Sequence, residues 1–456
     1  MTNTDTAAAR RAQISYDHAP LGRFHLRLGI ASVGGVFADG FGLGIIGIVL
    51  SLAGPRLSLG SLWLGLLGGA SLAGLFLGAV LAGPIEDRYG RRPVYAYNML
   101  VATALSGAQF FVANGSELLA LRIAIGFVLG TDYVVSKTLL IEFVPVVYRG
   151  RILSLLSVAW AGGYASAYAV GVALSHGGTE SWRWMLLASA IPCVLIAPLR
   201  LTMPESPLWL VRSGHLARAA SIVRAKFGED VFPPEPMPNP SDRAGQWLDL
   251  FSPRWRTRTL VGCTFFTCQV IPYFALGTFV TQILAALHIA GGAAGGLVYN
   301  FALFAGAIAG MLTVDRFSRR GFLIGSFALA AGALSALGLA RDAPAWIMIV
   351  SFAIFAGVVS AASNLVYVYL PELFPTKLRG SGIGLAVAAS RIGSAIGTFV
   401  LPIVLGTYGV RTALAACFSV LIVGMIVCWR FAPETRNLGL EALDRELVGD
   451  VGPGSD

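Results

Sequence analysis

Five charged residues stand inside long apolar stretches of this sequence: Asp39, Arg122, Asp132, Lys137 and Arg391. At the centre of a membrane such a side chain costs about 2.5–3.5 kcal/mol on insertion scales, so it persists when it pairs or serves a pathway. A carboxylate can take up and release a proton, and a guanidinium can bind a carboxylate through two parallel hydrogen bonds. The residue types therefore predict proton transfer and anion binding. No nucleophile–base set or phosphate-binding loop accompanies them, so we do not expect an enzyme.

The composition predicts an integral membrane protein. Of the 456 residues, 56% are hydrophobic and 12% are charged, and the mean hydropathy is +0.73, whereas soluble domains have about 25% charged residues. These values exclude a soluble enzyme and a nucleic-acid-binding protein. The net charge of +9 does not alter this, because the positive residues stand mainly in loops. The sequence has no Cys/His cluster, so we expect no metal and no cofactor.

Twelve apolar runs are long enough to cross a membrane as helices, which takes about 20 residues. The runs cover 27–50, 62–83, 94–113, 117–142, 152–174, 183–202, 258–285, 293–314, 321–340, 344–370, 380–406 and 411–432. Basic residues concentrate in the even-numbered loops, which by the positive-inside rule places both termini in the cytoplasm. Arginine far outnumbers lysine, which favours a bacterium with GC-rich DNA and hence the bacterial inner membrane.

Three pairs of motifs recur 228 to 230 residues apart. The pairs are Asp87–Arg92 with Asp315–Arg320, Glu142 and Arg149 with Glu372 and Arg379, and Pro204–Ser206 with Pro433–Thr435. The repeat predicts two homologous halves of six helices that enter the membrane in the same sense, with a site between them. The expected segments are a cytoplasmic tail (1–26), a first bundle (27–202), a cytoplasmic linker with short amphipathic helices (203–257), a second bundle (258–432) and a cytoplasmic tail (433–456).

The motifs resemble those of the major facilitator superfamily over essentially the whole chain. Residues 87–92 are similar to the superfamily signature between helices 2 and 3. Residues 142–151, 204–210, 371–380 and 433–436 resemble the sugar-porter branch and its relatives that carry metabolites and organic ions. The resemblance implies an all-α membrane protein with twelve transmembrane helices in two pseudo-symmetric six-helix bundles. It also implies a small-molecule substrate and alternating access, and we expect a monomer in the lipid bilayer.

The resemblance also implies a route for protons. In sugar porters an Asp in helix 1 and an Arg in helix 4 form the proton-coupling pair, and Asp39 with Arg122 resembles that arrangement. Asp132 stands in a segment that resembles the helix-4 signature of phosphate–proton symporters, so it is a second candidate proton carrier. Two alternatives stay open: a static Asp39–Arg122 pair, and a structural Asp132 paired with Lys137 or a neighbouring helix. Lys137 stands near the cytoplasmic end of its span, where we expect it to snorkel.

The second half supplies the candidate anion site. Arg391 stands about 11 residues into its span, roughly 16 Å deep, in a segment similar to helix 11 of organic anion transporters and aromatic-acid symporters. No acidic counterpart is evident at this depth in the second half, so an incoming anion is its predicted partner. The alternative is a pair with Asp39 or Asp132. Further candidates for binding substrate are Gln269, Tyr273, Trp160, Tyr164 and Asn300; Phe274 replaces the sugar-porter asparagine, which puts a hexose in doubt.

The repeated loops form a predicted cytoplasmic charge belt. Its members are Asp87, Arg91, Arg92, Glu142, Arg149, Glu205, Asp315, Arg319, Arg320, Glu372, Arg379 and Glu434. In sugar porters the matching residues form salt bridges that close the cytoplasmic side in the outward-open state. Exposed pairs contribute only about 0–1 kcal/mol each, which suits a gate that must break in every cycle. The alternative is a solvated positive face with no gating role.

These features predict proton-coupled uptake of a small organic anion, a monocarboxylate such as an aromatic acid or a sugar acid. Protons would use Asp39, Arg122 and Asp132, and Arg391 would hold the carboxylate. The main alternative is a sugar or polyol porter, by proton symport or facilitated diffusion; Gln269 and the Pro-Glu-Ser and Pro-Glu-Thr motifs favour it. A non-transporting receptor on the same fold would bind without flux, and the doubled gate argues against it.

Overall fold

The computed structural model is almost entirely helical and describes residues 14–16, 19–229, 231–232, 246–287, 292–339 and 344–436. In the first half the helices are α1 (Arg23–Arg56), α2 (Ser61–Tyr89), α3 (Arg91–Ala108), α4 (Gly115–Phe143), α5 (Val146–Leu174), α6 (Ser181–Ala188) and α7 (Ala190–Leu201). In the second half they are α11 (Arg256–Thr278), α12 (Val280–Ala286), α13 (Gly292–Thr313), α14 (Arg319–Leu339), α15 (Ala345–Ala362), α16 (Leu365–Glu372), α17 (Thr376–Tyr408) and α18 (Val410–Phe431). Helices suit a lipid environment because they satisfy every backbone hydrogen bond within the segment.

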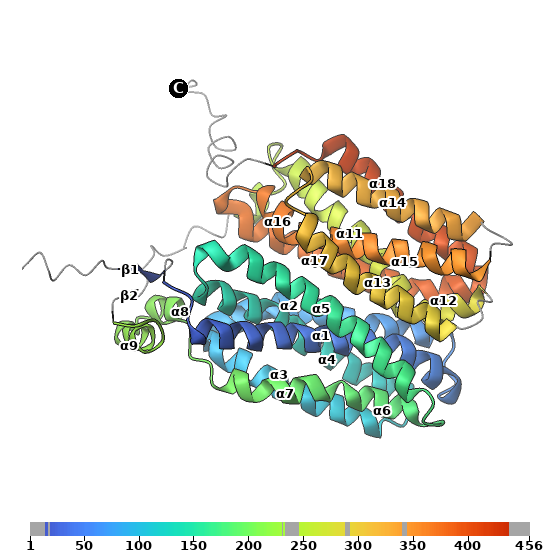
Figure 1. The fold of residues 1–456 in the computed structure, drawn as a ribbon, viewed down its shortest axis with the longest axis horizontal. Coiled ribbons are helices and arrows are strands. Elements are labelled where there is room, and N and C mark those ends of the chain that lie inside the picture. The colour runs from blue at the N-terminus through green and yellow to red at the C-terminus, as the bar shows by residue number, and fades with distance from the viewer. Residues whose placement is uncertain are drawn as a thin grey trace, which may run out of the picture.

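The helices form two bundles that lie side by side, with α1–α7 in one and α11–α18 in the other (Figure 1). Within the described residues, eleven helices are long and apolar enough to span a membrane. The twelfth predicted span corresponds to α3, which is less apolar because it begins with Arg91 and Arg92 and carries Asn98. The predicted fold class of two six-helix bundles is therefore confirmed.

The linker between the bundles lies at the end of the molecule where the repeated motifs gather, which we call the motif end (left in Figure 1). It contains α8 (Pro207–Arg212), α9 (Leu216–Phe227), β2 (Val231–Phe232) and α10 (Gln246–Asp249). The sequence did not predict that β2 pairs in parallel with β1 (Ile14–Ser15) near the N-terminus. The neighbouring Tyr16 hydroxyl donates to the Glu142 carbonyl at 2.7 Å, so the N-terminal segment is tied to α4.

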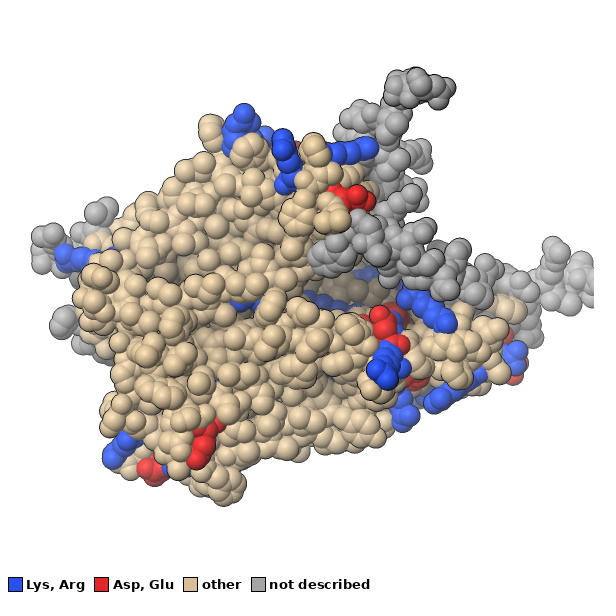
Figure 2. Space-filling model, turned by 180° about the vertical axis from the view of Figure 1, so that it is seen from behind, with Lys and Arg blue, Asp and Glu red and all other residues tan. Residues whose placement is uncertain are grey.

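The two halves touch at the end opposite the motif end. A Cβ atom on Gly47 of α1 would lie 2.2 Å from the Thr278 carbonyl oxygen, and one on Gly65 of α2 would lie 2.3 Å from that of Phe399 in α17. The hydroxyls of Tyr168 and Thr281 also form a hydrogen bond across the halves at 3.1 Å. At the motif end the surface is hollowed between the halves, and basic side chains are visible inside (right in Figure 2). The structure is thus closed at one end and open at the other.

Close helix contacts within the first half depend on glycine. Side chains of ordinary size keep helix axes about 8–10 Å apart, and small residues let backbones approach further. A Cβ atom on Gly78 of α2 would lie 2.0 Å from the Phe127 carbonyl oxygen of α4, and one on Gly126 of α4 would lie 2.1 Å from that of Ser71. The two helices therefore pack backbone to backbone, which sets the position of α4 and the charged residues it carries.

We expect Gly78→Ala to destabilise the protein by about 1–3 kcal/mol, because the added methyl group forces α2 and α4 apart. Gly83→Ala in the same helix is the matched control, since a Cβ atom there meets nothing within 4 Å. Thermal unfolding of the two purified variants in the same detergent measures the difference. Equal stability of the two variants would contradict the close contact.

Candidate functional site

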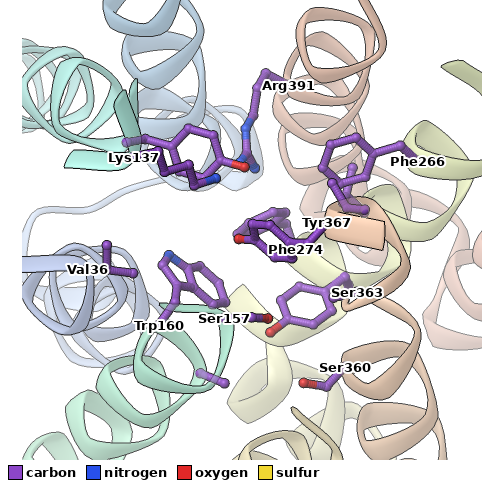
Figure 3. A pocket seen from close by; sticks show the side chains of 15 residues that line it. Val36, Lys137, Ser157, Trp160, Phe266, Phe274, Ser360, Ser363, Tyr367 and Arg391 are labelled. Carbon is purple, nitrogen blue, oxygen red and sulfur yellow. The ribbon is translucent and has the colours of Figure 1, made fainter. Parts of the chain in front are cut away.

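A cavity lies between the two halves. From the first half it is lined by Val36, Tyr133, Lys137, Ser157, Trp160 and Ala161. From the second half it is lined by Phe266, Val270, Tyr273, Phe274, Ser360, Ser363, Val366, Tyr367 and Arg391. Aromatic rings form much of the wall, and two cationic side chains point into the space (Figure 3). A mostly apolar cavity with a few convergent polar groups is the usual form of a small-molecule site.

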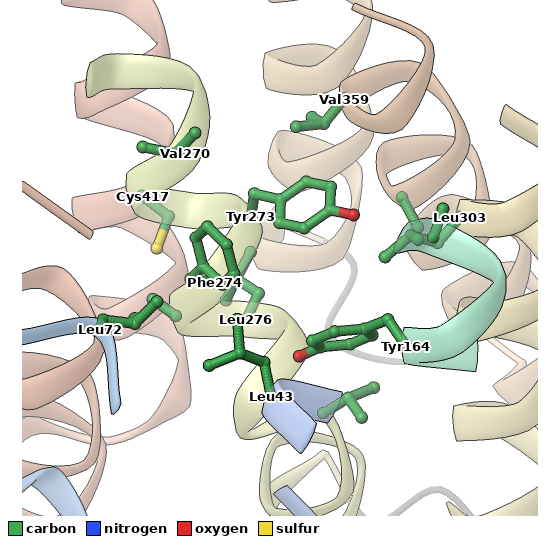
Figure 4. Packing of buried hydrophobic residues seen from close by; sticks show 14 of the residues in the cluster. Leu43, Leu72, Tyr164, Val270, Tyr273, Phe274, Leu276, Leu303, Val359 and Cys417 are labelled. Carbon is green, nitrogen blue, oxygen red and sulfur yellow. The ribbon is translucent and has the colours of Figure 1, made fainter. Parts of the chain in front are cut away.

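An apolar layer closes the cavity on the side away from the motif end. Leu43 of α1, Tyr164 of α5, Leu276 of α11 and Leu303 of α13 are all buried and pack together with Tyr273 and Phe274 (Figure 4). These side chains come from both halves, and Leu43 and Tyr164 lie one to two helical turns beyond the cavity residues Val36 and Trp160 of the same helices. A molecule in the cavity can therefore leave toward the motif end only, in the conformation that the structure describes.

Arg391 of α17 projects into the cavity as an unpaired cation. Its side chain is 7% exposed, and its Nε atom has no hydrogen-bond partner among the described residues. The guanidinium lies over aromatic rings, with Cζ 5.0 Å from the ring centre of Tyr133 and 6.0 Å from those of Phe266 and Phe274. It forms no ion pair with any described residue, so the alternative pairing with Asp39 or Asp132 is absent.

Lys137 of α4 also faces the cavity, so the expectation that it snorkels to the cytoplasmic surface was wrong. Its Nζ atom lies 3.2 Å from the ring centre of Tyr133 and 4.8 Å from that of Tyr367. These cation–π contacts hold the ammonium inside the protein. The face of α4 that carries Tyr133 and Lys137 is turned toward the second half, which the sequence alone did not reveal.

Asp132 forms a fully buried ion pair with Arg200 of α7. Both guanidinium Nη atoms contact the carboxylate, with Nη2 2.9 Å from Oδ2. The carboxylate also accepts hydrogen bonds from Asn98 Nδ2 and Ser136 Oγ, each at 3.0 Å. Arg200 Nε donates to the Ala31 carbonyl at 3.2 Å. This network joins α1, α3, α4 and α7, so a neighbouring helix supplies the partner of Asp132, which was one of the alternatives left open.

The structure does not bring Asp39 and Arg122 into an ion pair. Arg122 donates to the Gly42 carbonyl at 3.0 Å, and its Nε and Nη2 atoms have no partner among the described residues. Asp39 is 4% exposed and interacts electrostatically with Asp132, Arg200 and Lys137. Its Oδ1 atom has no described hydrogen-bond partner. The two side chains do not pair because they lie at different depths in the first half. Arg122 stands about 15 Å along α4 from Asp132, whereas the Asp39 carboxylate lies near Asp132.

Of the five remaining predicted substrate residues, two line the cavity and three do not. Trp160 and Tyr273 line the cavity. Tyr164 lies beneath it and stacks on Trp160 with ring centres 5.3 Å apart. Gln269 is turned away from the cavity, because its Nε2 atom donates to the Val359 carbonyl at 2.9 Å and to Ser363 Oγ at 3.0 Å. Asn300 is buried and donates to the Gly296 carbonyl of its own helix.

Sequence reasoning missed several residues of the site. Tyr133, Tyr367 and Phe266 line the cavity, but aromatic residues in apolar helices are usually core, so spacing gave no signal. Arg200 stands near the end of its predicted span, where a basic residue commonly snorkels. Its role depends on Asp132, which is 68 positions away in the sequence. Arg200 could have been inferred from the charges of the first half, because a buried Asp132 requires a cationic partner on the same side of the membrane-spanning bundle.

The charge belt forms matching clusters in the two halves. In the first half Arg91 contacts Asp87 at 3.1 Å and Glu142 at 3.5 Å, and Glu205 accepts from the backbone N–H groups of Arg91 and Arg92 at 2.9 and 3.1 Å. Arg92 Nε donates to the Met203 carbonyl at 3.1 Å. The Arg149 guanidinium donates to the Val144 carbonyl at 2.8 Å. These bonds hold the ends of α2–α5 and the start of α8 together.

The second half repeats this cluster. Arg319 contacts Asp315 at 3.1 Å and Glu372 at 3.6 Å, and Glu434 accepts from the backbone N–H groups of Arg319 and Arg320 at 3.0 and 3.1 Å. Burial alone would raise the pKa of the Glu434 carboxyl, but the N–H groups of Arg436, Arg319 and Arg320 outweigh burial and lower that pKa. Arg379 donates to the Pro371 carbonyl at 3.1 Å. The ion pairs of Arg91 with Asp87 and Glu142, and those of Arg319 with Asp315 and Glu372, each stay within one half.

Comparison with known proteins identifies the family. Residues 29–447 match the family described as "Sugar (and other) transporter". The chain belongs to this sugar-porter family of the major facilitator superfamily. The transporter is 37% identical to the inner membrane metabolite transport protein YgcS of Escherichia coli, over 96% of this chain and 97% of the relative. It is also 37% identical to the putative metabolite transport protein YaaU of Escherichia coli, over 93% and 96% of the two chains.

A solved structure supports the fold. The transporter superimposes on a partially occluded, inward-open structure of the xylose transporter XylE from Escherichia coli with a TM-score of 0.75. The match covers 91% of this chain and 99% of that chain at 19% identity. The transporter is therefore a multi-pass membrane protein that moves a small molecule, as its family does. The resemblance deduced from the repeated motifs is confirmed.

We expect Asp132→Ala to destabilise the transporter by about 3–5 kcal/mol, because the variant leaves the Arg200 guanidinium buried without its partner. Arg200→Met should destabilise the transporter by a similar amount, because it leaves the Asp132 carboxylate buried without its partner. The double variant should lose less stability than the sum of the two single variants. Thermal unfolding of the purified proteins supplies this double-mutant cycle, and additive losses would contradict a coupled pair.

Proposed function

We propose that the transporter is a proton-coupled importer of a small organic anion, a carboxylate whose acidic group binds Arg391. The proposal depends on the permanently charged Arg391 guanidinium, which lines the cavity between the two halves and has no acidic partner among the described residues. A charge out of water stabilises the protein only when an opposite charge compensates it. A carboxylate matches the planar fork of arginine, and the aromatic walls accept an apolar or flat body.

Asp39 is the proposed proton carrier. It is buried, half of its carboxylate has no described hydrogen-bond partner, and it lies near the Asp132–Arg200 pair and Lys137. Asp132 is a weaker candidate, since Arg200, Asn98 and Ser136 already satisfy its oxygens. Arg122 is proposed to influence Asp39 indirectly, by holding the backbone of α1, because it donates a hydrogen bond to the Gly42 carbonyl three residues after Asp39.

Alternating access is proposed to use the charge belt as the inner gate. The ion pairs of Arg91 and Arg319 stay within their own halves while the motif end is open. We propose that the acidic residues Asp87, Glu142, Asp315 and Glu372 exchange these partners for contacts across the halves when that end closes. We propose that the motif end and both termini face the cytoplasm of a bacterial cell.

A sugar porter is the second candidate. The family description names sugars, and the structurally similar XylE is a xylose transporter. Ser157 and Ser360 line the cavity and could donate hydrogen bonds to a neutral polyol. A neutral substrate leaves Arg391 uncompensated, and Gln269 is bonded away from the cavity, which favours the anion.

Uptake into proteoliposomes with acid outside tests the proposed function. The panel contains radiolabelled benzoate and gluconate, with xylose and glucose as neutral compounds. Entry into protein-free liposomes is subtracted, because protonated benzoic acid crosses a bilayer unaided. We expect anion uptake that depends on the proton gradient, that Arg391→Ala reduces at least about tenfold, and that Asp39→Asn uncouples from the gradient.

Arg411→Ala is the matched control, because Arg411 starts α18 outside the cavity residues. It should leave uptake unchanged. Sugar uptake that is indifferent to Arg391→Ala, with no uptake of either anion, would contradict the proposal and favour the sugar porter.

A further inference from the structure

The Lys137 ammonium has no role in the function proposed above, although it faces the same space as Arg391. Lys137 comes from α4 in the first half, and Arg391 comes from α17 in the second. The two cations meet at the Tyr133 ring, with Lys137 Nζ 3.2 Å and Arg391 Cζ 5.0 Å from its centre. Figure 3 shows the two side chains converging from different helices.

Two like charges face each other here without an acidic side chain between them. Among the described residues that line the cavity, none is acidic. Aromatic rings compensate a cation only in part, by about 0.5–2 kcal/mol, and two cations at short range repel. An anionic group placed between Lys137 and Arg391 would relieve this repulsion and would contact both halves at once.

Lys137 also interacts with the proposed proton carrier. The charged and titratable groups that face Asp39 are Asp132 and Lys137 of α4, and Arg200 and Cys193 of α7. The groups that face Lys137 are Tyr133 of its own helix, Asp39 of α1, Tyr367 of α16 and Arg391 of α17. Val36, three residues before Asp39 on α1, lines the cavity together with Lys137 and Arg391. Lys137 therefore interacts both with the carboxylate that can take a proton and with the cation that can hold an anion.

We propose that Lys137 is a second anchor for the substrate anion and that it links protonation of Asp39 to anion binding. An ionised Asp39 attracts the Lys137 ammonium and offsets part of the positive charge that an anion meets. A proton on Asp39 removes this attraction, and the ammonium then binds the same anionic group that Arg391 holds. The anion bridges α4 and α17, so its binding favours closure of the two halves. This inference rests on the proposed function, because it requires an anionic substrate.

Equilibrium binding of radiolabelled benzoate and gluconate to the purified full-length protein tests the inference. Both probes stay anionic at about pH 5.5 and about pH 8, so any pH effect belongs to the protein. We expect the wild type to bind about tenfold more tightly at the lower pH, a typical coupling between two sites. Lys137→Met should bind weakly at both pH values, whereas Lys137→Arg should retain the pH dependence. Asp39→Asn should bind tightly at both.

Lys226→Met is the matched control, because Lys226 lies in α9 over the Phe24 ring at 5.7 Å, outside the cavity. It should bind as the wild type does. Wild-type pH dependence in Lys137→Met would overturn the inference, while loss of binding in Arg391→Ala would leave the proposed function intact. A wild type that binds neither probe would overturn both.

Discussion

A charged side chain held among apolar helices needs compensation, because removing it from water costs several kcal/mol. The transporter meets this requirement fully at Asp132 and Arg200, whose side chains are 0% exposed and bonded to each other. Ser136 and Asn98 satisfy the carboxylate further, and the Arg200 guanidinium also lies over the Tyr95 ring, 4.2 Å from its centre. The same requirement is unmet at Arg391 and Lys137. The Asp132–Arg200 pair is thus neutral inside the first half, whereas the cavity has a positive charge that an anion can compensate.

The contrast between the two ends of the molecule follows from residue size and charge. At the closed end glycines bring backbones of different halves together, as at Gly47 and Gly65. These backbone contacts are close and involve no charged side chain. At the motif end the two halves carry matching ion-pair clusters around Arg91 and Arg319. Weak ion pairs can exchange partners at little cost, which suits a contact that forms and breaks as the halves move.

The sequence predicted most of the fold, because hydropathy and the repeated motifs are local signals. The twelve spans depend on residues within a few positions of one another. The two halves and the clusters around Arg91 and Arg319 were predictable because their short motifs occur twice in the chain. Arg391 was also predictable as a cavity residue from its depth alone. Roles that depend on which side of a helix faces the cavity were not predictable from the sequence. Lys137 was expected at the surface, but it lines the cavity. Gln269 and Asn300 were expected in the cavity, but they form hydrogen bonds to backbone carbonyls outside its lining. Arg200 needed a partner on another helix that no spacing reveals.

The central claim is that an anion and a proton enter together through this cavity, and the pH of a weakly buffered medium around proteoliposomes reports both. Adding benzoate or gluconate outside should make the medium more alkaline around wild-type proteoliposomes than around protein-free liposomes, because the transporter carries a proton with each anion. Asp39→Asn should abolish the change, and neutral sugars should produce none. Alkalinisation by xylose or glucose, with none from either carboxylate, would contradict the account.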